Sequence, residues 1–225
     1  MPGKALMTRS SSLRPFQTLE FEKHLWKSGF ARIAGIDEAG RGAWAGPVSA
    51  AVVILPPDPS LTHTLDRVRD SKLMTPLARE TWAPRIKENA LAWGVGFASS
   101  EEIDKLGILP ATRLAAMRAL ASLSPASRID NPDLIHPDCL LTDYLVFPEI
   151  ELPQTALVKG DQRSLSVASA SVLAKTARDA WMRQADMLYP GYGFARHKGY
   201  GTQFHQDAIK RLRHCNIHRE SFSIP

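Results

Sequence analysis

The chain has 225 residues, of which 44% are hydrophobic and 23% charged, so intrinsic disorder and fibrous architecture are excluded and one globular domain is expected. The longest strongly apolar stretch, residues 42–57, is too short and too interrupted by proline to cross a bilayer, so we expect no membrane partner. Two cysteines cannot build a disulfide framework, which favours a reducing compartment and predicts a cytoplasmic protein.

The net charge of +5 is unevenly distributed. Between Lys175 and Glu220, nine arginine and lysine residues stand against four acidic residues, and four of the seven histidines lie in the same segment. A basic face of this kind suits a polyanion such as nucleic acid, although a solvated helical surface would have the same composition.

The first part of the chain predicts a tail, a short helix and two strands. Residues 1–16 are serine-rich and basic, which predicts a disordered tail or, alternatively, an organelle transit peptide, and leaves 17–225 as the folded domain. A short amphipathic helix is expected at 19–26. Residues 32–36 and 48–55 are rich in β-formers and flank the glycine-rich segment 37–42.

The remainder alternates between helices and strands. Thr75-Pro76 is a helix-start signal, and Pro84 should kink or divide the helix that follows. The other expected elements are a strand at 91–98, helices from 101 and from 110 to about 123, a loop at 124–137, strands at 139–146 and 155–158, a long helix at 163–187, a loop at 189–201 and a last helix capped by Thr202 that ends near 213. This order predicts an α/β fold with a mixed sheet covered by helices.

Two adjacent acids, Asp37 and Glu38, follow an apolar strand and precede Gly40-Arg41-Gly42. Neighbouring side chains on a strand point to opposite faces, so one of the pair is directed toward the core. Such carboxylates are stable where a divalent cation neutralises them, although a surface turn with a salt bridge would also explain the pair. The glycines would allow backbone amides to approach a ligand, and the arginine could bind a phosphate.

Two further acids lie at predicted strand ends. Asp143 comes at the end of an apolar strand, and Asp161 follows another apolar run just before the long helix. Singly, Asp143 could be a turn residue and Asp161 a helix cap. Together with the first pair they make four carboxylates, and an oxygen-only ligand set favours Mg²⁺ or Mn²⁺ over zinc. Four acids within a basic protein indicate metal-assisted phosphodiester chemistry.

At this point the residues resemble a known family. The run IAGIDEAGRGAWAGPVSAAVVIL closely resembles the opening motif of ribonuclease HII, the type 2 ribonuclease H family. Further similar segments follow in the same order: 70–72 (DSK), 101–117, 158–161 (VKGD), 167–179 (VASASVLAKTARD), 192–202 (YGFARHKGYGT) and 218–222. The similarity covers residues 17–225.

The resemblance implies a ribonuclease H-like fold, with a mixed five-stranded sheet flanked by helices and a C-terminal helical portion. It also implies that Asp37, Glu38, Asp143 and Asp161 bind two Mg²⁺ or Mn²⁺ ions. The expected activity is cleavage of RNA in RNA–DNA hybrids and on the 5′ side of single ribonucleotides embedded in duplex DNA, leaving a 3′-hydroxyl and a 5′-phosphate, as in ribonucleotide repair. A monomer is expected.

Substrate contacts are implied for seven residues, Gly40, Arg41, Gly42, Ser71, Lys72, Lys198 and Tyr200. The glycine-rich loop could meet the ribose 2′-hydroxyl, which distinguishes RNA from DNA. Tyr200, in the segment HKGYGT, would pack against a sugar at the RNA-to-DNA junction, unless it is an ordinary core or surface tyrosine. Ser71, Lys72 and Lys198 are candidate phosphate contacts. Lys175 and Arg178 suit a structural role and a phosphate contact equally well.

Some features depart from the family pattern and leave alternatives open. Tyr144 follows Asp143 where many relatives have glycine. The assignment of Asp143 as the fourth metal-binding acid is therefore the weakest of the four, and Asp138 is the alternative. The alternative functions are a ribonuclease H that acts on long hybrids without single-ribonucleotide specificity, and a non-catalytic hybrid-binding module.

Overall fold

The computed structural model describes residues 17–126 and 136–223, so the predicted tail at 1–16 lies outside the described residues. The strands are β1 (Ile33–Ala39), β2 (Val48–Ile54), β3 (Ala92–Ala98), β4 (Ser124–Pro125), β5 (Cys139–Asp143) and β6 (Gln154–Leu157). The α-helices are α1 (Glu20–Lys27), α2 (Leu61–Thr64), α3 (Pro76–Asn89), α4 (Ser100–Leu106), α5 (Ile108–Ala121), α6 (Leu165–Leu188), α7 (Phe194–His197) and α8 (Gln203–Leu212). Two 3₁₀ turns, η1 (Ser71–Leu73) and η3 (Gly160–Gln162), lie near the strand ends.

The strands form one mixed sheet in the order β4-β3-β2-β1-β5-β6. The strands β1 to β4 pair antiparallel, whereas β5 runs parallel to β1 and β6 runs parallel to β5. The predicted mixed α/β fold is therefore confirmed. The strand number differs from the expected five, because two residues of the predicted loop, Ser124 and Pro125, pair with Trp93 and Ala92 of β3. A two-residue pairing leaves no hydrophobic alternation in the sequence.

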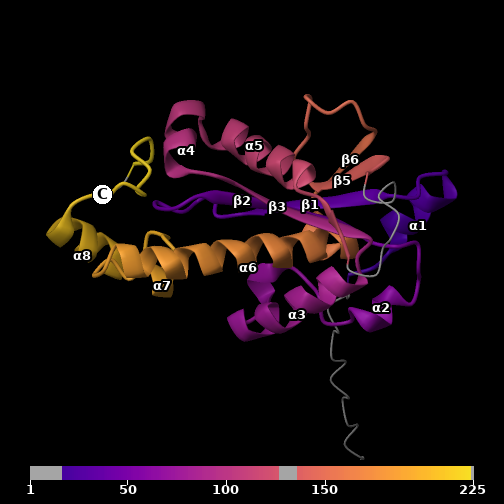
Figure 1. Ribbon diagram of the computed structural model, residues 1–225, viewed down its shortest axis with the longest axis horizontal. Coiled ribbons are helices and arrows are strands. Elements are labelled where there is room, and N and C mark those ends of the chain that lie inside the picture. The colour runs from indigo at the N-terminus through magenta and orange to yellow at the C-terminus, as the bar shows by residue number, and fades with distance from the viewer. Residues whose placement is uncertain (1–16, 127–135, 224–225) are drawn as a thin grey trace, which may run out of the picture.

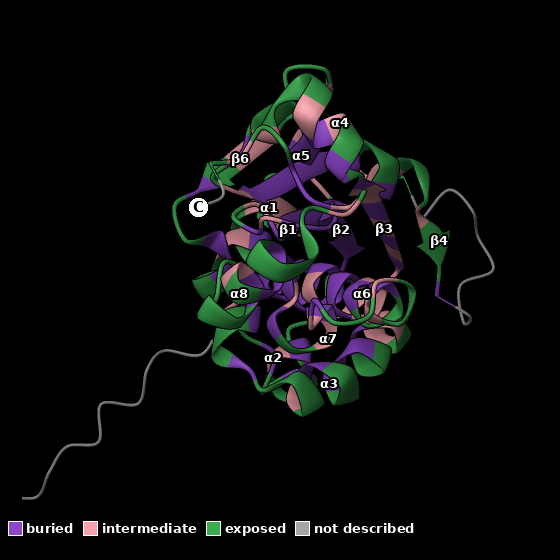
Figure 2. Ribbon diagram, turned by 90° about the vertical axis from the view of Figure 1, so that its left-hand side faces the viewer, coloured by how far each residue is buried: buried purple, intermediate pink, exposed green. Residues whose placement is uncertain are grey.

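Helices cover both faces of the sheet (Figure 1). The long helix α6 crosses β1 and β2 on one face, with α3 beside it, and α5 covers β2 and β3 on the other. Gly35 makes the close packing of α6 on β1 possible, because a Cβ atom there would collide with the backbone of Ser166. In Figure 2 the central strands β1 and β2 and the inner side of α6 are buried, while β4 and the outer surfaces of α3, α4 and α8 are exposed.

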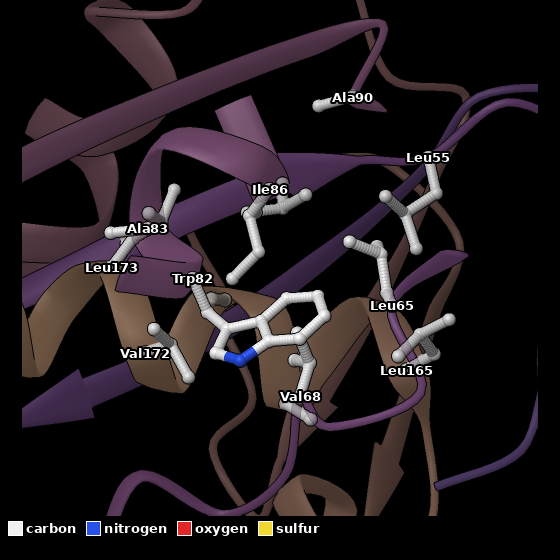
Figure 3. Close-up of a cluster of buried hydrophobic side chains, with 14 of the residues drawn as sticks. Leu55, Leu65, Val68, Trp82, Ala83, Ile86, Ala90, Leu165, Val172 and Leu173 are labelled. Atoms are coloured by element: carbon white, nitrogen blue, oxygen red, sulfur yellow. The ribbon is translucent and has the colours of Figure 1, made fainter. Parts of the chain in front are cut away.

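The core is divided by the sheet into two main layers. Figure 3 shows the layer between the sheet and α6, in which Trp82 and Ile86 of α3 pack with Val172 and Leu173 of α6. All seven residues of β2 are buried, so this strand contacts both layers. No helix among the described residues is long and apolar enough to cross a membrane.

The predicted caps are largely confirmed. Thr75 accepts a hydrogen bond from the amide of Ala78, Ser99 forms a reciprocal capping box at the start of α4, and Thr202 caps α8. Pro84 was expected to kink or divide its helix; it does not divide it, since α3 continues through it. The predicted loop at 189–201 contains the short helix α7.

A buried carboxylate joins α1 to the start of α6. Glu22 is fully buried, and its Oε1 accepts hydrogen bonds from the hydroxyls of Ser164 and Ser166 at 2.6 Å each and from the amide of Ser166 at 2.9 Å. A negative charge at a helix N-terminus interacts favourably with the helix dipole. Nearby, the Gln17 side-chain amide donates to the Asp161 carbonyl at 3.3 Å. The N-terminal segment therefore supports the turn that carries Asp161.

We expect Glu22→Ala to lower the free energy of unfolding by about 3 kcal/mol, because three buried donors lose their acceptor. The matched control is Glu20→Ala in the same helical turn, where the side chain is exposed and the change should be small. Urea unfolding followed by circular dichroism measures both. Equal stability of the two variants would contradict the anchoring role of Glu22.

Candidate active site

The topology brings the predicted acids to one edge of the sheet. Parallel strands present their carboxyl ends at the same edge, and β1, β5 and β6 are parallel neighbours. Asp37 lies near the end of β1, Asp143 is the last residue of β5, and Asp161 lies in η3 directly after β6. The amide of Gly160 donates to Oδ1 of Asp143 at 2.7 Å, which ties the end of β5 to the turn that carries Asp161.

Asp37 is the most buried member of this group after Asp161, with 5% of its surface exposed. Its Oδ1 accepts a hydrogen bond from the amide of Glu38 at 2.8 Å. Burial raises the pKa of Asp37 well above its ordinary value, and the charges of Glu38 and Asp143 raise it further, while a hydrogen bond from Ser171 on α6 opposes them. The carboxyl is thus held where its negative charge is poorly compensated.

Glu38 and Asp161 share this electrostatic environment. Burial raises the pKa of Glu38, although the guanidinium of Arg41, 3.1 Å from Oε1, opposes the shift. Burial raises the pKa of Asp161 to about 6, with contributions from the neighbouring charges of Asp70 and Asp143. Lys72, whose Nζ lies 3.8 Å from Oδ2 of Asp161, partly offsets that repulsion.

The donor set fits a hard divalent cation. All four groups are carboxylates, and their burial and mutual repulsion leave negative charge that Mg²⁺ or Mn²⁺ would neutralise. In the part of the chain that the structure describes, no three His, Cys, Asp or Glu side chains already stand as a preformed metal-binding group. The carboxylates would therefore have to move closer together around an ion.

The raised pKa of Asp161 predicts pH-dependent metal binding. A metal ion competes with protons for a carboxylate, so protonation below about pH 6 should weaken Mn²⁺ affinity. We expect roughly fourfold weaker binding at about pH 5.5 than at about pH 7.5, measured by titration calorimetry. Asp161→Asn should show a smaller dependence on pH. Equal affinity of the parent protein at both pH values would rule out Asp161 as a ligand that titrates in this range.

A groove with a volume of about 560 Å³ lies beside the acids. Glu38 lines it together with the predicted loop Gly40-Arg41-Gly42, with Ser71 and Lys72 of η1, and with Lys175 and Tyr200. Ile108 and Phe222 also line the groove. The Tyr200 ring is 36% exposed and lies over two cations, with Lys175 Nζ at 5.5 Å and Arg178 Cζ at 5.4 Å from its centroid. A flat ring thus stands at the wall of a basic groove.

The three predicted phosphate contacts differ in their positions. Lys72 is exposed and free to reach a ligand, whereas Ser71 is buried and its hydroxyl accepts a hydrogen bond from Ser171 at 2.9 Å. Lys198 does not line the groove, because its side chain folds back and donates to the carbonyl of Ala195. Contact of Lys198 with substrate therefore needs a different side-chain conformation.

Two alternatives from the sequence can be placed in the structure. Asp138, the rival of Asp143, lies before β5 and accepts hydrogen bonds from the amides of Ala31 and Arg32 at 3.0 Å each. That position is the opposite end of the strand from the acidic site. Tyr144 has a φ of 64°, the left-handed conformation that glycine adopts most easily, so a tyrosine at this position carries some backbone strain.

Three of the four histidines between Lys175 and Glu220 do not form part of a basic face. His197, His205 and His218 are buried, with the rings of His197 and His205 stacked at 4.4 Å. Burial lowers the pKa of His205 and of His218 to about 4, so both are neutral at physiological pH. Periodicity alone could not separate these interior rings from surface ones.

Three residues outside the predicted metal-binding and substrate-binding sets also shape the site; for one of them, Asp179, the family resemblance implies a structural or supporting role. Asp70 is buried next to Asp161 and accepts a hydrogen bond from the amide of Lys72 at 2.9 Å. Asp179 forms a buried ion pair with Arg79 at 3.0 Å and a second contact with Lys175 at 2.7 Å. Arg219 lies beneath the glycine-rich loop. All three lie in segments that resemble the family, 70–72, 167–179 and 218–222, and that resemblance was the signal available for them.

The mixed sheet, with its acidic edge beside a basic groove, defines a nuclease of the ribonuclease H-like fold. A family model described as ribonuclease HII matches residues 34–224. A ribonuclease HII of Thermus thermophilus is 49% identical over 202 residues, which cover 90% of this chain and 91% of that protein. The chain therefore belongs to the ribonuclease HII family, and it is a metal-dependent endonuclease that hydrolyses RNA in RNA–DNA hybrids.

Solved structures show the same fold. The ribonuclease H2 of Pyrococcus horikoshii OT3 matches with a TM-score of 0.67 at 25% identity, covering 86% of this chain and 94% of that one. The structure of Bst-RNase HIII in complex with Mn²⁺ matches with a TM-score of 0.63 at 19% identity, over 86% of this chain and 67% of that one. The individual roles of the site residues stay predictions.

Proposed function

We propose that the protein incises duplex DNA on the 5′ side of a single embedded ribonucleotide, as well as RNA within longer hybrids, and so begins ribonucleotide repair in the cytoplasm as a monomer. The observation that carries the proposal is the position of four carboxylates on one edge of the sheet, at or just after the ends of three parallel strands, beside a groove lined by Gly40-Arg41-Gly42 and Tyr200. The folded unit would be residues 17–225.

The metal-binding residues would be Asp37, Glu38, Asp143 and Asp161, with Mg²⁺ or Mn²⁺ as the ion. A pair of such ions supplies an activated water for attack on the phosphorus and stabilises the departing 3′-oxygen, which leaves a 3′-hydroxyl and a 5′-phosphate. Asp37 and Glu38 both lie on β1, between β2 and β5, and Asp37 is the more buried of the two. Its fixed hydrogen bond to the Glu38 amide leaves the second oxygen for an ion.

Substrate recognition would divide between the two sides of the groove. Lys72 is exposed beside Asp161 and would hold a backbone phosphate without reading sequence. The amides of the Gly40-Arg41-Gly42 loop would meet the ribose 2′-hydroxyl, the group that distinguishes RNA from DNA. Tyr200 would pack against the sugar of the neighbouring deoxynucleotide, where its ring is exposed to the groove.

The second candidate function is a ribonuclease H that cleaves only long RNA–DNA hybrids. The same four carboxylates would catalyse both reactions, and only Tyr200 and the Gly40-Arg41-Gly42 loop would recognise the junction between RNA and DNA. The test is cleavage of an end-labelled DNA duplex with one ribonucleotide, beside an all-DNA duplex and a long RNA–DNA hybrid, in Mg²⁺, Mn²⁺ or EDTA. We expect a metal-dependent nick on the 5′ side of the ribonucleotide. Cleavage of the long hybrid alone would contradict single-ribonucleotide specificity and support the second candidate.

A further inference from the structure

Two arginines are buried beneath the groove. Arg178 of α6 and Arg219 of the C-terminal segment are both fully buried. Neither has a carboxylate oxygen within 4.0 Å among residues 17–126 and 136–223. Asp179 and Asp104 act on them only at longer range. Burying a charge without an ion pair lowers the stability of a protein, so the presence of each buried guanidinium needs a specific structural reason.

Backbone carbonyls take the place of an acidic partner. Arg219 donates to the carbonyls of Gly40 and Arg41 at 2.8 Å each, and to that of Gly46 at 3.0 and 2.9 Å. Arg178 donates to the carbonyls of Pro47 at 2.8 Å, Ala45 at 3.0 Å and Lys198 at 2.9 Å. Arg219 thus connects the beginning of the loop between β1 and β2, at Gly40 and Arg41, to its end at Gly46. Arg178 connects the same loop to the segment that carries Tyr200.

This bonding turns the loop carbonyls inward. With the oxygens of Gly40 and Arg41 directed at a buried cation, the opposite side of these peptide units lies toward the groove. Within the described ranges, the amides of Arg41 and Gly42 donate to no protein acceptor. Gly40 has a φ of 96°, and a Cβ atom there would collide with the Arg178 side chain. The arrangement therefore leaves two backbone donors open on the groove side.

We propose that Arg219 is a positioning residue for ribose recognition: its guanidinium fixes the Gly40-Arg41-Gly42 loop with its carbonyls inward, so that the loop amides are available to a ribose hydroxyl. Arg178 completes the support by setting the distance between this loop and Tyr200. The inference rests on the proposed function, because it explains how the same groove distinguishes a ribonucleotide from a deoxynucleotide. Arg219 itself touches no substrate.

The test separates positioning from general stability. Binding is measured in the Asp37→Asn background, which should not cleave, for an all-DNA duplex and for the same duplex with one ribonucleotide. We expect the Asp37→Asn protein to bind the ribonucleotide duplex about tenfold more tightly than the all-DNA duplex, which corresponds to one hydrogen bond between uncharged groups. Arg219→Met should bind both duplexes equally. Arg219→Lys, which keeps a cation and fewer donors, should show an intermediate preference and serves if Arg219→Met does not fold.

The matched control is Val53→Ala, a fully buried substitution in β2 that lowers stability without touching the loop. It should keep the preference for the ribonucleotide duplex. An undiminished preference in both Arg219 variants would overturn the inference and leave the proposed function intact. Loss of the preference in Val53→Ala as well would reduce Arg219 to a general contribution to stability. Absence of any preference in the background protein would contradict the proposed function and the inference together.

Discussion

Asp37→Asn is expected to reduce cleavage by about 1,000-fold or more, since the loss of a metal-binding carboxylate would remove several kcal/mol of transition-state stabilisation. Binding of the hybrid should change little, because the groove contacts come from other residues. The measurement is single-turnover cleavage of an RNA–DNA hybrid together with its equilibrium binding. Asp66→Asn is the matched control, an exposed aspartate of the same size outside the groove. Turnover of Asp37→Asn near the parent rate would remove Asp37 from the metal site.

The same substitution should stabilise the metal-free protein. The pKa of Asp37 is higher in the folded protein than in the unfolded chain. At pH values between these two pKa values, the folded protein therefore binds more protons than the unfolded chain. The free energy of unfolding consequently falls as the pH rises through this interval. Asparagine removes the cost of the buried charge at neutral pH. Each kcal/mol gained would raise the melting temperature by about 2–4 °C. A lower melting temperature for Asp37→Asn in EDTA would contradict this electrostatic account.

Tyr200→Ala is expected to reduce cleavage at a single embedded ribonucleotide by about 10- to 100-fold, the range of one stacking contact of about 1–3 kcal/mol. The loss on a long RNA–DNA hybrid should be smaller, because a junction is not needed there. The quantity to measure is kcat/KM on both substrates.

Tyr200→Phe is the conservative control for this experiment. The ring is the part of Tyr200 that lies over Lys175 and Arg178, so phenylalanine should keep most of the activity on both substrates. Equal losses of Tyr200→Ala on the two substrates would exclude junction sensing and assign the residue to general groove packing.

The acidic edge of the sheet could be predicted from the sequence because each acid follows an apolar run. Asp37 lies near the end of β1 and Asp143 ends β5, and both strands are recognisable from their β-formers. The resemblance to the family implied that the two strands are neighbours. The position of Asp161 depended on the same reasoning, although its turn is short. The helix caps at Thr75, Ser99 and Thr202 were predictable for a local reason, since each serves a helix that begins at the next residue.

Other features depend on contacts between distant parts of the chain and left no local pattern. Arg219 lies 179 positions from Gly40, whose carbonyl it binds, and Glu22 lies 142 positions from Ser164. The burial of His205 and His218 likewise follows from packing of the C-terminal segment. The two-residue strand β4 is too short for any periodicity, and the hydrogen bond from Lys198 to the carbonyl of Ala195 has no signal in the sequence.

The measurement that most directly tests the central claim is anomalous diffraction from crystals of the protein with Mn²⁺ and an uncleaved RNA–DNA hybrid. The account predicts two Mn²⁺ ions about 4 Å apart at the edge formed by β1, β5 and β6, with oxygens of Asp37, Glu38, Asp143 and Asp161 as their protein ligands. The scissile phosphate should lie between the ions. Mn²⁺ bound elsewhere, or ions at this edge that none of the four carboxylates contacts, would contradict the account.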